Sequence, residues 1–283
     1  MCVEREPYQT ARAGTGQSGN GSRSLLIRGG LVAGADGVLE TRDVRIVDGR
    51  IAPAGAGALP HDDVEVIDAT GCLVLPGFVN MHSHSYGTLC RHDGARLPLE
   101  PWMNYALAGT ANRTPDEILV ATQLQAIEAL RTGTTAVVDH IGGAVAGLAP
   151  VLGAYEDSGI RAAVAPMIGD IPLPDSVGLS AEDWPPGTGY GAPEFAQKPA
   201  AELLDDTLAL RRSWTSPSGR VAVILGPSAP QRCSTDLLAS VAEAAEREDM
   251  LVHTHLLETR LQAALTPRSG VAPGWTSWTE RGS

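Results

Sequence analysis

From residue 73 onward the sequence repeats one unit, an apolar strand followed by an amphipathic helix. Five strands are predicted, at 73–84, 134–140, 161–169, 221–226 and 250–255. Helices are predicted between them at 114–133, 147–159, 200–214 and 235–249. This alternation favours an α/β fold, in which helices cover a parallel sheet. Right-handed crossovers between such strands give two common folds, an open doubly wound sheet and an eightfold TIM-type (β/α) barrel.

The segments on either side of the repeat have a different character. Residues 25–71 consist of short alternating runs separated by Gly-Gly and Asp-Gly pairs, which predict a small antiparallel β unit. Residues 1–24 are polar and lack the apolar core of a signal peptide, so we expect a disordered leader. Residues 265–283 show no apolar period, and we expect a tail that does not continue the repeat.

Charge and cysteine usage restrict the function classes. The chain carries 33 acidic and 21 basic residues, a net charge of -12, which argues against nucleic-acid binding. No run of about 18 apolar residues occurs, so no membrane span is predicted. The four cysteines show no CxxC spacing and predict reduced thiols in a cytoplasmic protein, with Cys72 buried.

Two of the predicted strands end in a His-x-His pair, His82 with His84 and His253 with His255. Alternate residues of a strand point to one face, so each pair presents two imidazoles on the same side. Ligands of parallel α/β sheets bind at the carboxyl ends of the strands. The two pairs therefore indicate a metal site, and the alternative is a set of core histidines joined by hydrogen bonds.

An acidic residue, Glu258, follows His255 by three positions. A carboxylate just beyond the strand is suited to accept the proton of a metal-activated water and to pass it to a leaving amine. The alternative is a solvated glutamate at the start of a helix.

Several runs of sequence resemble the amidohydrolase superfamily. The run LVLPGFVNMHSH, preceded by DVRIVDGRIA and VEVIDATG, resembles its start, and LRTGTTAVVDH and GPSAPQRCS followed by VHTHLLET resemble later strands. The most similar branch contains guanine, methylthioadenosine/adenosylhomocysteine and triazine-type deaminases and chlorohydrolases, and the resemblance covers residues 24–264. It implies two metal ligands at His82 and His84, a third at His255, a proton shuttle at Glu258, and a pocket-lining role for His253.

The resemblance also implies one divalent ion. Binuclear members of the superfamily bridge two metals through a carbamylated lysine on the fourth strand, but that strand here reads VAVILGPSAP and the only lysine is Lys198. Imidazole-rich ligation suits zinc, with iron as the alternative. The implied reaction is hydrolysis of a carbon–nitrogen bond other than a peptide bond, with a small heterocycle such as a purine, pterin or triazine as substrate.

Two further side chains are weaker candidates for substrate contact. His140 ends the second strand of the repeat, where it lies at the pocket rim if the sheet closes as a barrel, and contact with substrate and packing are both open. Trp102 follows the first strand and is placed either in a lid over the substrate or buried against a helix.

The length of the repeat departs from the superfamily pattern. Residues 72–264 hold five strand–helix units, whereas a complete barrel has eight, so the expected fold is an incomplete barrel preceded by a partial β-sandwich at 25–71. The superfamily's sixth-strand histidine and eighth-strand aspartate have no counterpart, so the alternative function is a catalytically inactive truncated fragment that retains at most metal binding. We expect an open inner face at Val137, Val164 and Ile224 to promote a homo-oligomer.

Overall fold

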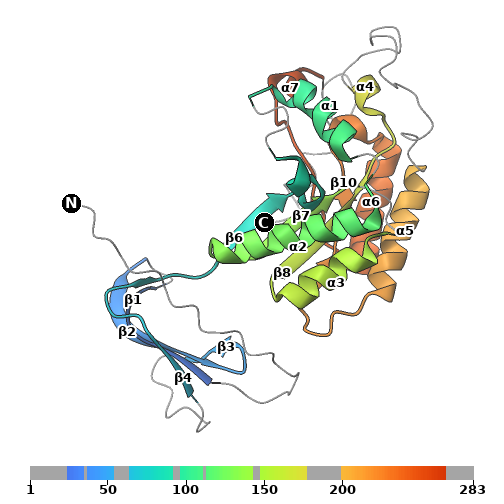
Figure 1. The fold of residues 1–283 in the computed structure, drawn as a ribbon. Helices are drawn as coiled ribbons and strands as arrows, with labels where there is room; N and C mark the ends of the chain where they lie inside the picture. The colour runs from blue at the N-terminus through green and yellow to red at the C-terminus, as the bar shows by residue number, and fades with distance from the viewer. Residues whose placement is uncertain are drawn as a thin grey trace. The chain divides into compact units, whose positions relative to one another are not determined.

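The computed structural model describes residues 24–34, 37–53, 64–91, 96–110, 113–142, 147–176 and 199–265. The chain divides into two compact units, Met1–Pro76 and Gly77–Ser283 (Figure 1). The predicted leader and tail lie outside the described residues, apart from Ser24 and Leu265. None of the helices in the described ranges is both long and apolar enough to span a bilayer.

The first unit is a five-stranded sheet. Its strands are β1 (Ser24–Ala33), β2 (Leu39–Val47), β3 (Arg50–Ile51), β4 (Val64–Asp68) and β5 (Leu73–Val74). The order is β3-β2-β1-β4, and β5 also pairs with β1. β2 runs antiparallel to β1 and to β3, as predicted, but β4 and β5 run parallel to β1.

The prediction of an antiparallel unit over residues 25–71 is therefore wrong for β4, and β5 belongs to the predicted strand at 73–84. Tight turns set only the local hairpins, such as Asp48-Gly49, where both residues have a positive φ and close β2 onto β3. β4 instead joins β1 after a longer connection from β3, which permits parallel pairing. The expected burial of Cys72 is also wrong, because this residue follows the turn at Thr70-Gly71 and is exposed.

The second unit confirms the predicted α/β fold. Its parallel strands are β6 (Phe78–Ser83), β7 (Thr134–Ile141), β8 (Arg161–Ile168), β9 (Val221–Val223) and β10 (Gly226–Pro227). The order runs β6-β7-β8, and both β9 and β10 pair with β8. Each strand therefore follows its predecessor across the sheet, as in the early units of a barrel.

Three predicted strands differ in detail. The strand at 73–84 is divided by Pro76, which cannot donate a ladder hydrogen bond, into β5 of the first unit and β6 of the second. The strand at 221–226 is interrupted between β9 and β10. The strand at 250–255 is an extended segment with one bridge, between Val252 and Leu225.

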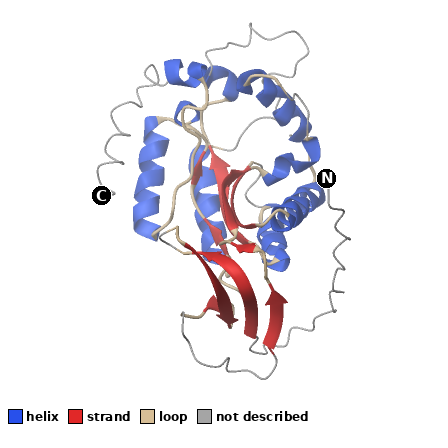
Figure 2. Cartoon of the chain, turned by 90° about the vertical axis from the view of Figure 1, so that its left-hand side faces the viewer, coloured by secondary structure: helices blue, strands red, loops and turns tan. Residues whose placement is uncertain are grey.

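Helices flank the strands of the second unit (Figure 2). The four predicted helices are α2 (Pro115–Arg131), α3 (Ala149–Ser158), α5 (Ala200–Ser213) and α6 (Thr235–Glu248). The structure adds α1 (Leu99–Thr110), α4 (Leu173–Ser176), α7 (Arg260–Leu265) and the 3₁₀ turns η1 (Ser85–Cys90) and η5 (Pro230–Arg232). Thr114 is the N-cap of α2 and forms a reciprocal capping box with Glu117.

The core of the second unit lies between the sheet and its helices. α2 and α3 lie side by side over β7 and β8 (Figure 1), and their apolar faces pack with Val137 and Val164. Ile224 packs against Val138 and Ala165. Val137, Val164 and Ile224 are at most 6% exposed, so the expectation that they form an open face is wrong. The alternation of side chains along a strand predicts that neighbouring residues face opposite sides of the sheet, but it does not predict which side the helices cover.

Exposed apolar side chains lie instead on β6, the edge strand of this sheet. Phe78, Val79 and Met81 are 58–63% exposed. An apolar edge strand offers unpaired backbone groups to another chain.

We expect this edge to promote self-association, and the variant Val79→Lys to reduce it by placing a charge on the strand. Sedimentation over a concentration series measures the effect. Leu130→Lys, on the exposed face of α2, is the matched control and should leave the association unchanged. Equal association of the wild type and both variants would contradict a role for β6.

Candidate metal centre

Five imidazoles meet at the carboxyl end of the parallel strands. His82 and His84 stand at the end of β6, His140 lies in β7, and His253 and His255 lie in the extended segment after α6. The ring centroid of His82 lies 4.7 Å from that of His84, 4.8 Å from that of His255 and 5.0 Å from that of His253. Segments about 170 residues apart in the sequence therefore build one cluster.

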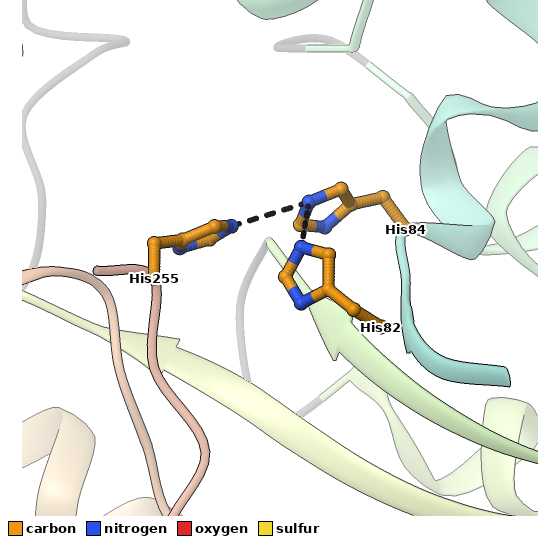
Figure 3. Close-up of side chains that lie close together, drawn as sticks. All are labelled: His82, His84 and His255. Carbon is orange, nitrogen blue, oxygen red and sulfur yellow. Dashed lines mark hydrogen bonds between the residues drawn. The ribbon is translucent and has the colours of Figure 1, made fainter. Parts of the chain in front are cut away.

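Three of these rings direct one nitrogen toward a common region (Figure 3). The Nε2 atom of His84 lies 3.1 Å from Nε2 of His82 and 3.3 Å from Nε2 of His255. A tetrahedral ion with nitrogen ligands at about 2.0–2.1 Å holds them about 3.3–3.4 Å apart. These two distances are close to those around a single zinc-sized ion, and one nitrogen from each of His82, His84 and His255 lies within 4.8 Å of the others.

The other nitrogens of two of these rings fix the tautomer. His84 Nδ1 lies 2.6 Å from the carbonyl oxygen of His140, and His255 Nδ1 lies 2.6 Å from the carbonyl oxygen of Ser228. A carbonyl oxygen only accepts, so each Nδ1 carries the proton and each Nε2 carries a lone pair. This arrangement is typical of metal-binding histidines, whose second nitrogen donates to a backbone or side-chain acceptor.

Burial favours the neutral form of four of these imidazoles. It lowers the pKa of His84 to about 4 and that of His140 to about 2, and it also lowers the pKa of His82 and His253. The charges of neighbouring imidazoles act in the same direction. Neutral rings at pH 7 offer the lone pairs that a divalent ion requires.

These pKa shifts predict acid sensitivity of the metal-free protein. Above pH 6.5 His84 and His140 are mostly neutral in both the folded and the unfolded chain, and below it the unfolded chain binds protons that these two residues do not bind when folded. The free energy of unfolding should therefore fall from about pH 6.5 to about 4, by up to roughly 1.4 kcal/mol per pH unit and group. Urea unfolding at several pH values measures the slope, and His140→Gln should make it shallower. A constant stability between pH 7 and 5 would rule the effect out.

A buried carboxylate orients the segment that carries His84. Asp139 accepts hydrogen bonds from the backbone N–H of Ser85 and from the hydroxyl of Tyr155, both at 2.8 Å, and burial raises the pKa of Asp139. Gln125 donates to Ser83 Oγ at 3.0 Å. The sequence reading did not identify Asp139 as part of the site, although an aspartate inside the apolar run AVVDH was a usable signal.

Glu258 is exposed and lies next to the cluster on the same segment as His255. Its N–H donates to Gln262 Oε1 at 2.9 Å, and Gln262 Nε2 donates to a Glu258 carboxylate oxygen at 3.4 Å. Burial lowers the pKa of His82, and the charge of Glu258 partly opposes that shift. Leu257 adopts a φ of 52°, an unusual conformation for a leucine that turns the chain just before Glu258.

The two weaker candidates fall in different environments. His140 is fully buried rather than at a rim; its Nε2 lies 3.2 Å from the carbonyl oxygen of Gly226, and its ring stacks on His255. This burial supports the packing alternative for His140. Trp102 lies on α1 and is 36% exposed, so it is not buried against a helix. Contact of either residue with substrate stays a prediction.

Curated relatives of this chain are deaminases of adenosine derivatives. It is 30% identical over 260 residues to the 5'-deoxyadenosine deaminase of Methanothermobacter thermautotrophicus, covering 89% of this chain and 53% of that protein. It is 34% identical over 242 residues to the 5-methylthioadenosine/S-adenosylhomocysteine deaminase of Desulforudis audaxviator, covering 84% and 50%. The chain thus spans about half the length of these relatives.

Solved structures share the fold. A triazine hydrolase variant superposes with a TM-score of 0.76 at 22% identity, covering 92% of this chain and 58% of that chain. The atrazine chlorohydrolase TrzN from Arthrobacter aurescens TC1, complexed with zinc, gives a TM-score of 0.67 at 22% identity, covering 88% and 58%. The model of the amidohydrolase family matches residues 73–266. This match contains the β6 histidines, the parallel strands and the segment from His253 to Glu258, and the chain belongs to the amidohydrolase family.

Proposed function

We propose that this chain carries the metal site of a hydrolase that removes the amino group of a small aminated heterocycle, such as a purine, pterin or triazine. The observation that carries the proposal is the convergence of His82, His84 and His255, in which His84 Nε2 lies 3.1 Å from His82 Nε2 and 3.3 Å from His255 Nε2, close to the spacing of ligands on one tetrahedral ion. Three imidazoles favour zinc, with iron as the alternative. The deaminase relatives support a carbon–nitrogen bond as the target.

The proposed chemistry assigns separate tasks to the side chains. His82, His84 and His255 would hold a divalent ion, which would supply the Lewis acidity that makes water a nucleophile near neutral pH. Glu258 accepts a proton at a carboxylate oxygen and delivers it to the departing amino nitrogen, which leaves as ammonia. Trp102, His140 and His253 are the candidates for lining the substrate pocket.

A single ion is part of the proposal. The fourth-strand segment β9–β10 contains no lysine that could bridge two metals, and Lys198 lies outside the described residues. A cytoplasmic location, based on the pattern of cysteines, belongs to the same proposal.

Ammonia release tests this function. The purified chain is loaded with zinc or ferrous iron and incubated separately with an adenosine derivative, guanine, a pterin and an aminotriazine, and ammonia is measured with and without a chelator. We expect metal-dependent release from at least one of these classes. Tight metal binding without release from any of them would refute the catalytic proposal for this chain.

A second candidate function is a catalytically inactive unit that binds metal. The observation that favours it is that the chain spans about half the length of its deaminase relatives. Three imidazoles bind an ion, but catalytic zinc sites also need a positioned water and a formed substrate pocket. This candidate predicts the same metal affinity as the first and no turnover, so the ammonia assay separates the two.

A further inference from the structure

The two ring nitrogens of His82 face different partners. Nε2 lies 3.1 Å from His84 Nε2, on the side of the candidate ion, whereas Nδ1 lies 2.7 Å from Nε2 of His253. Two nitrogen ligands of one tetrahedral ion stand about 3.3–3.4 Å apart, so 2.7 Å is too short for that relation. It is within the range of a hydrogen bond. The contact between His82 and His253 is therefore an N–H···N hydrogen bond.

The direction of this hydrogen bond follows from the role of His82. A metal ligand needs a lone pair on Nε2, so the ring proton of neutral His82 is on Nδ1 and is donated to His253. His253 then accepts at Nε2 and carries its own proton on Nδ1.

We propose that His253 is a positioning residue that holds His82 in the Nδ1–H tautomer with Nε2 directed at the ion. The proposal rests on the metal site of the proposed function and changes the role that the family resemblance implied for His253. The other two ligands have backbone acceptors, the carbonyl oxygens of His140 and Ser228. Among the three ligands, His82 is thus the one whose acceptor is a side chain.

His82 also depends most on such a partner. It is exposed, whereas His84 and His255 are partly buried by surrounding residues. Packing therefore restricts the ring of His82 least, and the hydrogen bond to His253 supplies the missing restraint. Loss of the partner of a metal-bound histidine typically costs 10–100-fold in metal affinity.

The variants His253→Ala and His253→Gln test the proposal, with Thr254→Val as the control from the same extended segment. Zinc affinity is measured by competition with a chromogenic chelator. We expect His253→Ala to weaken zinc binding about 10–100-fold. His253→Gln, whose amide oxygen accepts a hydrogen bond, should recover most of the loss, and Thr254→Val should bind like the wild type.

A second readout follows the tautomer directly and needs no metal. Nitrogen-15 NMR of the imidazoles in the metal-free protein should show His82 as the Nδ1–H tautomer in the wild type and a shift toward Nε2–H in His253→Ala. A wild-type His82 in the Nε2–H form would overturn the proposal even if a variant failed to fold. Equal zinc affinity of wild type and His253→Ala, or equal losses in the Ala and Gln variants, would also overturn it.

Metal stoichiometry separates this role from direct ligation. His82, His140 and His253 also place one nitrogen each within 4.8 Å of one another, as a second ion would require. We expect one zinc per chain, and a second zinc that is lost in His253→Ala would overturn the positioning role. If the wild type binds no zinc, the proposed function fails, while the tautomer of His82 in the metal-free protein still decides the role of His253.

Discussion

The variant His84→Ala is expected to lower the affinity for zinc by about 10²–10³-fold. A tetrahedral site of four ligands binds zinc with roughly 10–16 kcal/mol, so one imidazole accounts for about 2.5–4 kcal/mol. His84 is the shared neighbour of the three, since its Nε2 lies within 3.3 Å of both His82 and His255. The variant therefore keeps only two of the three proposed ligands, His82 and His255, and loses the ring that lies close to both.

Chelator competition and elemental analysis of the purified protein measure this loss. Leu89→Ala is the matched control, because Leu89 lies in η1, the 3₁₀ turn that begins directly after His84, and is 45% exposed. The alternative of core histidines joined by hydrogen bonds makes a different prediction, in which His84→Ala changes stability and neither protein takes up zinc. Absence of zinc uptake by the wild type would therefore refute the metal centre rather than the choice of ligand.

The parts of this site that the sequence predicted follow from local rules. A strand places His82 and His84 on one face, and parallel strands bring their carboxyl ends to one edge, where His255 also arrives. These rules need only the residue period and the direction of the chain. They were sufficient to bring the two His-x-His pairs together, whereas the choice of His255 rather than His253 as the third ligand came from the family resemblance.

The parts that the sequence did not predict depend on contacts between distant elements. β4 pairs with β1 in the parallel direction, on the side of β1 opposite β2. No tight turn next to β4 determines which edge of the sheet it joins or in which direction. Val137 and Val164 alternate as expected, but only the positions of α2 and α3 decide that their side is the covered one. The hydrogen bond between His82 and His253 could not be predicted for the same reason. The two residues are 171 positions apart, and the strand period alone sets no distance between them.

The variant Glu258→Gln is expected to lower turnover by about 10²–10⁴-fold while zinc affinity stays close to that of the wild type. General acid–base catalysis contributes a factor of this size, and an amide cannot take up and return the proton. The substitution keeps the size of the side chain and the oxygen that accepts from Gln262 Nε2. It should therefore preserve the turn at Leu257 and the position of His255.

Ammonia release and zinc affinity, measured on the same preparation, check this prediction. Glu246→Gln on α6 is the control, since it makes the same chemical change on a helix outside the histidine cluster and should alter neither quantity. A Glu258→Gln protein with full turnover would exclude Glu258 as the proton shuttle. If wild type and variant both bind zinc and both release no ammonia, the chain is the inactive metal-binding unit, because proton transfer limits the rate only where the substrate reaches a competent site.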